Sequence, residues 1–98
     1  MSLPIILEDD AQAEYDEAFD WYDARSAVKA VEFEQAVEAV LTRIGAQPRA
    51  HAVVYKDVRR ALVRGFPYCV YYAEEPQQVV VISVFHTSRD PAIWQGRR

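Results

Sequence analysis

The 98-residue sequence contains a single cysteine, Cys69, so no disulfide can form within the chain, and this composition is typical of a reducing compartment. It also lacks any run of 18 or more apolar residues, so we expect no membrane-spanning helix. The N-terminal residues have neither the basic start nor the long apolar segment of a secretion signal. These absences predict a cytoplasmic protein with no part in a membrane. The length fits one domain over residues 1–98.

Basic residues are scarce in the first half of the chain. Residues 1–48 carry 3 Lys and Arg against 11 Asp and Glu, a net charge of −8, whereas residues 49–98 carry 8 against 4, a net charge of +4. The overall charge of −4 argues against a protein that coats nucleic acid without specificity. The second half can nevertheless hold a local basic site.

The first half predicts a strand and two helices. Residues 3–7 form a short apolar run, and Pro4 within it confines that run to a strand start or a sheet edge. Residues 11–23 and 27–44 repeat apolar positions at three- and four-residue steps, which is helical spacing. Ser26 is expected to cap the second helix, and Gly45 is expected to end it in the left-handed conformation. The short link between the helices favours an antiparallel hairpin.

The second half predicts a sheet. Residues 49–56 fit a short strand or a loop, and strands are expected from residue 58, over 68–73 and over 79–86. The last strand is apolar on both faces, which is typical of a strand that is buried on both faces and central in its sheet. His86 alternates with Val80, Ile82 and Val84, so we expect it at the end of a row that faces the core. Asp90 is expected to cap a helical turn over residues 92–95.

The predicted fold class is α+β: an N-terminal strand, an antiparallel helical hairpin and a three- to four-stranded, mainly antiparallel sheet. Two helices can cover only one face of that sheet. Either the C-terminal segment or another chain must therefore cover the second face.

Two blocks of residues resemble the RelE/ParE superfamily of bacterial type II toxins. One block is Phe66-Pro67-Tyr68 followed by Val70 and Tyr72, and the other joins His86, Arg89, Pro91 and Trp94. With the helical hairpin before them, these blocks extend the resemblance over almost the whole chain. The resemblance implies a βααβββ fold, a cognate antitoxin as partner and no cofactor. Its members include RelE-like toxins, which cut mRNA on the ribosome, and ParE-like toxins, which poison DNA gyrase and are not nucleases.

RNA cleavage needs a base, an acid and cations that stabilise the charge on the phosphate, and it needs no metal. The residues of the second half that fit these roles are the candidate catalytic residues His86, Arg60, Arg64 and Arg89. A second group is expected to bind nucleic acid or another target: Arg59, Tyr72, Trp94 and Arg97. Each of these residues also has an ordinary structural role open to it, as a surface charge, a packing aromatic or a rim residue. No spacing of His, Cys, Asp and Glu predicts a metal site.

Three functions remain open at the level of sequence. The first is a metal-independent endoribonuclease that inhibits translation as the toxin of a type II module, of the kind that also stabilises plasmids. The second is a ParE-like toxin that binds DNA gyrase without catalysis. The third is an inactive member that binds only its antitoxin. The family's strong nucleases are very basic, and this chain has only one lysine, Lys56, in its second half, which counts against the first.

Overall fold

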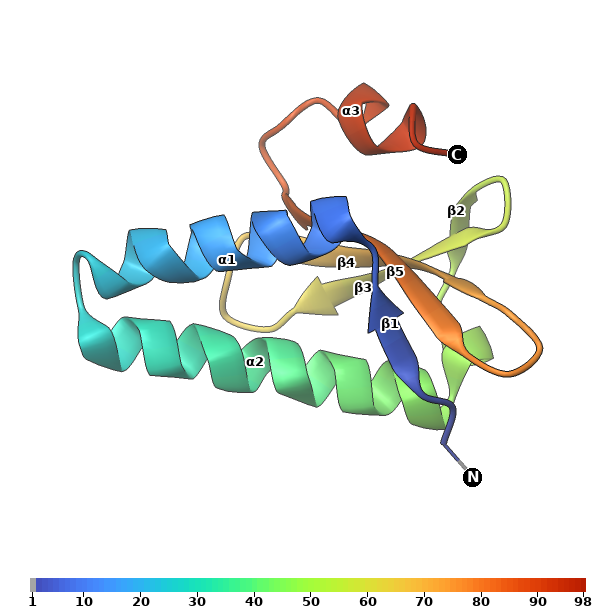
Figure 1. Cartoon of the computed structure of the whole chain (residues 1–98), viewed down its shortest axis with the longest axis horizontal. Helices are drawn as coiled ribbons and strands as arrows, with labels where there is room; N and C mark the ends of the chain where they lie inside the picture. The colour runs from blue at the N-terminus through green and yellow to red at the C-terminus, as the bar shows by residue number, and fades with distance from the viewer. Residues whose placement is uncertain (1) are drawn as a thin grey trace.

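The computed structural model describes residues 2–98, which form a five-stranded sheet with an antiparallel pair of helices on one face (Figure 1). The strands lie in the order β1-β5-β4-β3-β2. β1 (Ile5–Leu7) runs parallel to β5 (Val79–His86), and the other neighbours are antiparallel. This architecture confirms the predicted α+β fold. β5 has a strand on each side and is buried as expected, but the middle position of the sheet belongs to β4 (Tyr68–Glu74).

The helical hairpin consists of α1 (Asp9–Asp23) and α2 (Ala27–Ala46). Ser26 caps α2 as predicted, because its hydroxyl accepts a hydrogen bond from the backbone N–H of Lys29 at 3.2 Å. Glu8 occupies the N-cap position of α1, but its side chain makes no capping bond. Aromatic side chains of both helices pack against the turn that joins β3 to β4. There the ring of Phe33 on α2 and the ring of Phe66 in the turn are centred 5.2 Å apart.

The prediction for Gly45 is wrong. Gly45 lies inside α2, and its φ is not positive; α2 ends one residue later and is followed by a 3-10 turn, η1 (Pro48–Ala50). The carbonyl of Gly45 accepts a hydrogen bond from the N–H of Leu3 at 2.9 Å. A Cβ on Gly45 would lie 3.0 Å from the carbonyl oxygen of Leu3. This glycine therefore permits the chain leading into β1 to approach α2.

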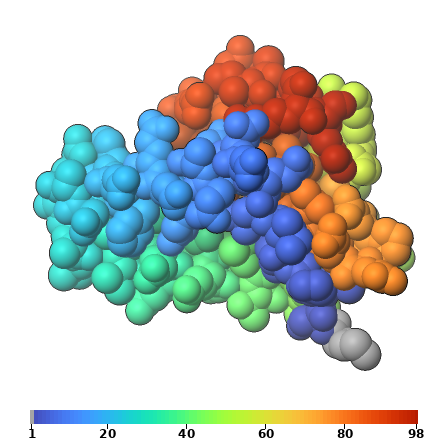
Figure 2. Space-filling view, in the orientation of Figure 1, coloured from blue at the N-terminus to red at the C-terminus, as the bar shows by residue number. Residues whose placement is uncertain are grey.

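The sheet separates two apolar cores. The core on the helix side, here called the helix-side core, includes Phe33, Val37, Val63, Val70 and Tyr72 among its buried side chains. The second core lies on the opposite face and consists of Val58, Cys69, Tyr71, Ala73, Ile82, Phe85 and Trp94. Its cover is the C-terminal segment, which carries the short helix α3 (Ala92–Gln95) and packs beside the start of α1 (Figure 2). The C-terminal segment of the same chain thus covers the second face of the sheet. This was one of the two alternatives expected from the sequence.

A bulge in β5 changes which side chains share a face. Tyr71 pairs with Ser83, but Tyr72 pairs with Val81, so Ile82 is an extra residue in β5. Val81 and Val84 consequently both belong to the helix-side core, while Ile82 lies in the second core. His86 keeps its expected alignment with Val84 but not with Val80 and Ile82, because alternation breaks at the bulge.

The edge of the sheet opposite β1 is short and apolar. β2 (Val53–Tyr55) pairs with the first residues of β3 (Val58–Val63), and Leu62 further along β3 is 59 % exposed.

Within residues 2–98, no helix is both long enough and apolar enough to cross a bilayer.

Candidate functional site

His86 ends β5 on the helix side of the sheet. Its ring contacts Tyr68 edge to face, with ring centroids 5.0 Å apart. The backbone N–H of Ser88 donates to Nδ1 of His86 at 3.1 Å, and the Ser88 hydroxyl lies 2.8 Å from the same nitrogen. Because Nδ1 accepts a backbone hydrogen bond, the neutral imidazole carries its proton on Nε2. His86 is therefore arranged as a hydrogen-bond donor at Nε2.

Arg89 lies beside His86 on the segment that follows β5. Its backbone N–H donates to the carbonyl of His86 at 3.2 Å, and its guanidinium lies over the ring of Phe85 at 5.0 Å. The Arg89 side chain is 49 % exposed and reaches a carboxylate oxygen of Glu14 at 3.9 Å. This spacing is a loose ion pair, which leaves Arg89 accessible.

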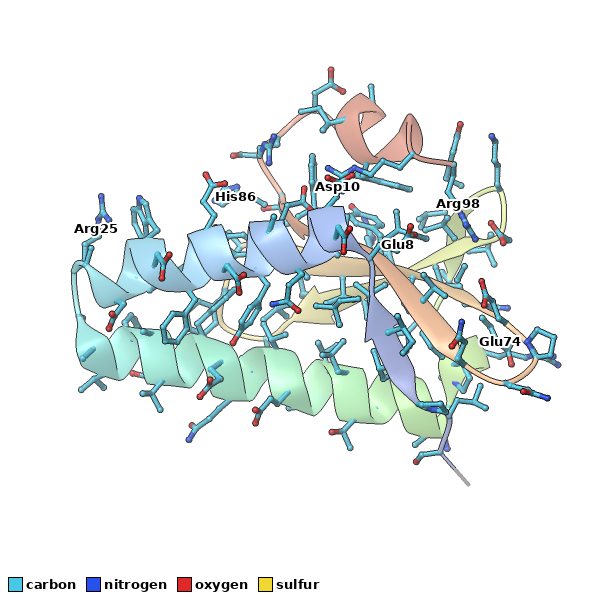
Figure 3. The ribbon with its side chains drawn as sticks, in the orientation of Figure 1. Glu8, Asp10, Arg25, Glu74, His86 and Arg98 are labelled. Carbon is cyan, nitrogen blue, oxygen red and sulfur yellow. The ribbon has the colours of Figure 1, made fainter. Side chains whose placement is uncertain are left out.

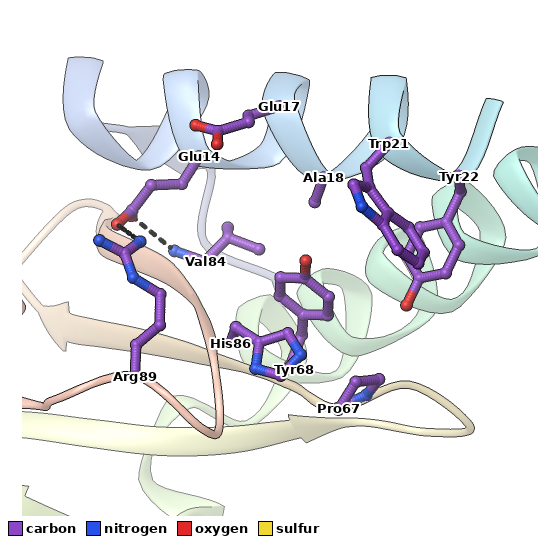
Figure 4. Close-up of a pocket in the computed structure, with 10 residues that line it drawn as sticks. All are labelled: Glu14, Glu17, Ala18, Trp21, Tyr22, Pro67, Tyr68, Val84, His86 and Arg89. Carbon is purple, nitrogen blue, oxygen red and sulfur yellow. Dashed lines mark hydrogen bonds and ion pairs between the residues drawn. The ribbon is translucent and has the colours of Figure 1, made fainter. Parts of the chain in front are cut away.

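His86 and Arg89 line a cavity of about 370 Å³ between α1 and the sheet, here called the α1 cavity. The side toward the sheet is made by Pro67, Tyr68 and Val84, and α1 supplies the opposite side (Figure 4). The lining residues from α1 are Glu14, Glu17, Ala18, Trp21 and Tyr22. The α1 cavity brings together two of the predicted site residues, His86 and Arg89, and it has the size of a small-ligand pocket.

Arg60 does not reach this cavity. In the strand register Arg60 pairs with Tyr71, which belongs to the second core, whereas His86 pairs with Tyr68, which packs on the helix-side core. Arg60 and His86 thus lie on opposite faces of the sheet. Arg64 is exposed in the turn after β3 and does not line the cavity either. Of the four predicted catalytic residues, the structure brings only His86 and Arg89 together.

Two predicted aromatic binding residues are buried. Tyr72 is 0 % exposed, and its hydroxyl donates to the carbonyl of Pro48 at 2.6 Å. That hydroxyl oxygen lies 3.1 Å from Nδ1 of His51, and burial raises the pKa of Tyr72 to about 12. Trp94 is 2 % exposed and stacks on Tyr71, with ring centroids 4.1 Å apart. Neither ring presents a face to a nucleotide in this structure, so both act as core residues.

The remaining two arginines bind backbone carbonyls. Arg59 donates to the carbonyl of His51 at 2.6 Å, which fixes the segment before β2. Arg97 donates to the carbonyl of Ile82 at 3.1 Å and makes two hydrogen bonds to Glu14, at 3.1 and 3.0 Å. The hydrogen bonds to Glu14 raise the pKa of Arg97 above its usual value.

Glu14 was not predicted from the sequence, and it organises this part of the molecule. Its carboxylate accepts from the Ser83 hydroxyl at 2.8 Å and from the backbone N–H of Val84 at 3.3 Å, in addition to Arg97. β1 pairs with β5 only as far as Val81. Beyond that point, Glu14 accepts a hydrogen bond from the N–H of Val84, and Arg97 donates one to the carbonyl of Ile82. Both of these backbone groups belong to β5 and lie where β1 no longer pairs with it. The ion pair thereby closes the open strand edge.

Within residues 2–98, no group of three or more His, Cys, Asp and Glu side chains is placed to hold a metal ion.

His51 stands alone near Tyr72. Burial lowers the pKa of His51, and the positive charges of Arg43 and Arg59 lower it further. Figure 3 places Arg25 at the turn end of the helical hairpin, with Glu74 and Arg98 toward the opposite end of the molecule.

Comparison with known proteins decides the family. Residues 5–91 match the family described as the ParE toxin of the type II toxin–antitoxin system parDE. The chain belongs to the ParE toxin family. This membership confirms the resemblance to the RelE/ParE superfamily that the sequence blocks suggested.

A solved structure supports the fold of this ParE-family toxin. It is titled as the chromosomal ParDE TA system from P. aeruginosa, and one of its chains superposes with a TM-score of 0.68 at 15 % sequence identity. The superposition covers 89 % of this toxin and 98 % of that chain. At this identity the likeness shows the fold alone. No curated protein matches the toxin significantly.

Proposed function

We propose that this ParE-family toxin arrests growth by binding a protein target, DNA gyrase, and that it does not cleave RNA. The observation that carries this proposal is the position of Arg60 on the opposite face of the sheet from His86. Cleavage of RNA needs a base, an acid and charge-stabilising cations within hydrogen-bonding reach of one phosphate. The predicted cluster of His86 with three arginines is not assembled.

The two residues that remain together are poorly suited to cleavage. Nδ1 of His86 accepts the Ser88 N–H, so the neutral ring offers a donor at Nε2 where a base would need a lone pair. Arg89 faces the carboxylate of Glu14, which offsets its attraction for a phosphate. Membership of the ParE family also favours gyrase over mRNA, since the ParE-like branch of the superfamily consists of gyrase poisons.

The alternative function is RelE-like cleavage of mRNA on the ribosome by His86 and Arg89 alone. The observation in its favour is that both side chains line one cavity and that Arg89 is half exposed. A ligand phosphate in that cavity would meet a single guanidinium, that of Arg89, and the Nε2 donor of His86. This alternative is therefore the weaker of the two.

We also propose a cognate antitoxin, in the cytoplasm, as the partner that holds the toxin inactive. The surface beside β2 and β3 supports such a partner, because it exposes apolar side chains next to positive charge. The exposed apolar residues are Val53 and Val54 on the edge strand β2 and Leu62 on β3, and the exposed Arg60 lies on the same face of β3 as Leu62. An antitoxin segment with apolar and acidic side chains would complement this surface.

The deciding experiment measures both targets with the full-length chain. Purified toxin is added to a gyrase supercoiling reaction and, separately, to a ribosome-dependent mRNA cleavage reaction. We expect loss of supercoiling and intact mRNA. His86→Ala and Arg89→Ala should each leave mRNA intact as in the unchanged toxin. Cleavage of mRNA that disappears in His86→Ala, with normal supercoiling, would establish the alternative.

A further inference from the structure

The outer edge of β5 is closed only along part of its length. β1 pairs with this edge as far as Val81. Arg97 then binds the carbonyl of Ile82, and Glu14 accepts from the N–H of Val84 (Figure 4). Past these contacts, β5 continues to its last residue without a neighbouring strand on this side.

Two backbone groups at the end of this edge are without a partner. Because the N–H of Val84 points outward to Glu14 and residues alternate along a strand, the carbonyl of Val84 and the N–H of His86 also point outward. Thr87 supports this alternation, since its N–H donates toward β4, to the carbonyl of Pro67 at 2.9 Å. Within residues 2–98, neither outward group is hydrogen-bonded. One residue of a parallel strand binds such a pair, because it donates to the carbonyl and accepts from the N–H.

The same two residues line the α1 cavity. Val84 and His86 lie on its β5 side, and α1 lines it from Glu14 to Tyr22, a length of about 12 Å from the helical rise per residue. An extended chain of about three to four residues has this length. Apart from its charged residues, the rest of the lining is apolar or aromatic, from Ala18, Trp21, Tyr22, Pro67 and Tyr68. The cavity therefore offers strand-type backbone partners on one side and apolar surface on the other.

The fold already contains this kind of pairing, since β1 is a three-residue segment that adds in parallel to the same strand. We propose that an extended segment of the cognate antitoxin enters the α1 cavity and adds to β5 in parallel, beyond the end of β1. The segment residue opposite Phe85 donates to the Val84 carbonyl and accepts from the His86 N–H. The residues before and after it share the face of Val84 and His86 and pack against Trp21 and Tyr68.

The chemistry of the edge selects this occupant. A free carbonyl and a free N–H at strand spacing match the main chain of a polypeptide, so the ligand is a protein segment. A second copy of the toxin has no free segment to insert, because its longest loop within residues 2–98 is the five residues 87–91. The inference rests on the antitoxin partnership proposed above and is independent of the target that the toxin attacks.

The first test is an NMR titration of the full-length toxin, produced by cell-free synthesis with ¹⁵N labelling. The probe is acetyl-Val-Thr-Val-methylamide, and the matched comparison carries a methyl group on the threonine nitrogen, which removes the donor to Val84. We expect a saturable downfield shift of the His86 amide proton with the first peptide and at least about 10-fold weaker binding of the second. Equal binding of the two peptides would refute strand addition, as would the absence of a saturable shift at His86.

Two variants locate the bound peptide. Trp21→Ala should weaken binding of the unmethylated peptide by about 3- to 10-fold, because apolar contact with the cavity wall is lost. Val28→Ala on α2 is the control, since Val28 is also exposed and does not line the cavity. Equal affinities of the Trp21→Ala protein and the unchanged toxin would contradict the proposed position.

The second test uses the small protein encoded beside the toxin gene and measures hydrogen exchange of the toxin amides in the complex. We expect exchange at His86 to slow by at least about 10-fold, because its N–H becomes hydrogen-bonded. A stable complex with unchanged exchange at His86 would overturn strand addition and leave the antitoxin partnership intact. Failure of the two proteins to bind would contradict the partnership itself, and with it the antitoxin as occupant.

Discussion

At the scale of single residues, the contacts of a side chain decide a role that its chemistry leaves open. Tyr72 has an aromatic face and a hydroxyl, so the sequence allows it to stack on a base. In the structure its ring is in the helix-side core, and its hydroxyl joins β4 to Pro48 and His51. Because that hydroxyl donates to the Pro48 carbonyl, it can only accept from His51, which places a proton on Nδ1 of His51.

Tyr72→Phe should change how stability depends on pH. Burial raises the pKa of the Tyr72 phenol from its ordinary value of 10.0, which applies in the unfolded chain, to about 12 in the folded protein. The stabilisation from the neutral phenol is therefore complete below about pH 10 and is lost as the pH rises through about 12. We expect Tyr72→Phe to cost roughly 1 kcal/mol at pH 7, where two hydrogen bonds are lost. The difference should shrink above pH 10.

Urea unfolding of both proteins at intervals between pH 7 and pH 11 checks this expectation, with absorbance at 295 nm reporting tyrosine ionisation. The other tyrosines are present in both proteins, so the difference between the two curves isolates Tyr72. A stability difference that stays constant over the whole range would show that Tyr72 ionises as in the unfolded chain.

At the scale of elements, two local features override the regular patterns. The extra residue Ile82 in β5 shifts alternation, so Val81 and Val84 face the same core although they are three positions apart. Gly45 lies within α2, where a glycine is normally unfavourable, because β1 begins against the helix at that point. In both cases a neighbouring strand determines the local geometry.

Gly45→Ala should destabilise the fold although alanine favours helices. Helix propensity alone would stabilise α2 by about 1 kcal/mol. The added Cβ would lie 3.0 Å from the carbonyl oxygen of Leu3, however, and overpacking of this kind costs about 1–3 kcal/mol. We expect a net loss of about 1 kcal/mol, measured by urea unfolding.

The control for this prediction is Gly96→Ala at the C-terminal end of α3. Gly96 has a helical φ of −64°, and the nearest atom to its added Cβ is 3.4 Å away, which is an ordinary contact. Its stability should be unchanged or slightly higher. A Gly45→Ala protein that is more stable than the unchanged toxin would mean that β1 yields to the methyl group at little cost.

At the scale of the whole molecule, the C-terminal segment completes the fold. Trp94 inserts into the second core, and Arg97 binds Glu14 on α1, so the last residues join the two sides of the sheet. Cys69 is 4 % exposed beneath this segment, and burial raises the pKa of its thiol. The second core is thus protected by a helix of only four residues.

Trp94→Leu should therefore increase the reactivity of Cys69. The smaller side chain leaves space above Tyr71 and costs about 2 kcal/mol, by analogy with other reductions in core side-chain size. We expect a thiol reagent to modify Cys69 at least about 10-fold faster, because local opening of the segment becomes more frequent. Ile93→Leu is the control, since Ile93 is exposed and outside the second core. Equal rates in all three proteins would show that another segment protects the thiol.

Much of the architecture follows from periodicity in the sequence. Residues 27–44 present one apolar face at helical spacing, and residues 79–86 are β-branched on both faces, so the second helix and the interior strand could be predicted directly. Ser26 could also be identified as a cap, because its role depends on bonds three residues away. These features are local, and local sequence is sufficient for them.

The site could be predicted only in part, because it depends on contacts between distant segments. His86 and Arg89 are three residues apart and lie together as expected. Arg60 was separated from His86 by strand register, and Glu14 joined the site from 69 residues away through Ser83. The sequence by itself indicated the two helices, the strands from residue 58 onward and the resemblance to the toxin superfamily. The tertiary structure decided which charges meet, since the face that a side chain occupies depends on pairing and on one bulge that no local pattern encodes.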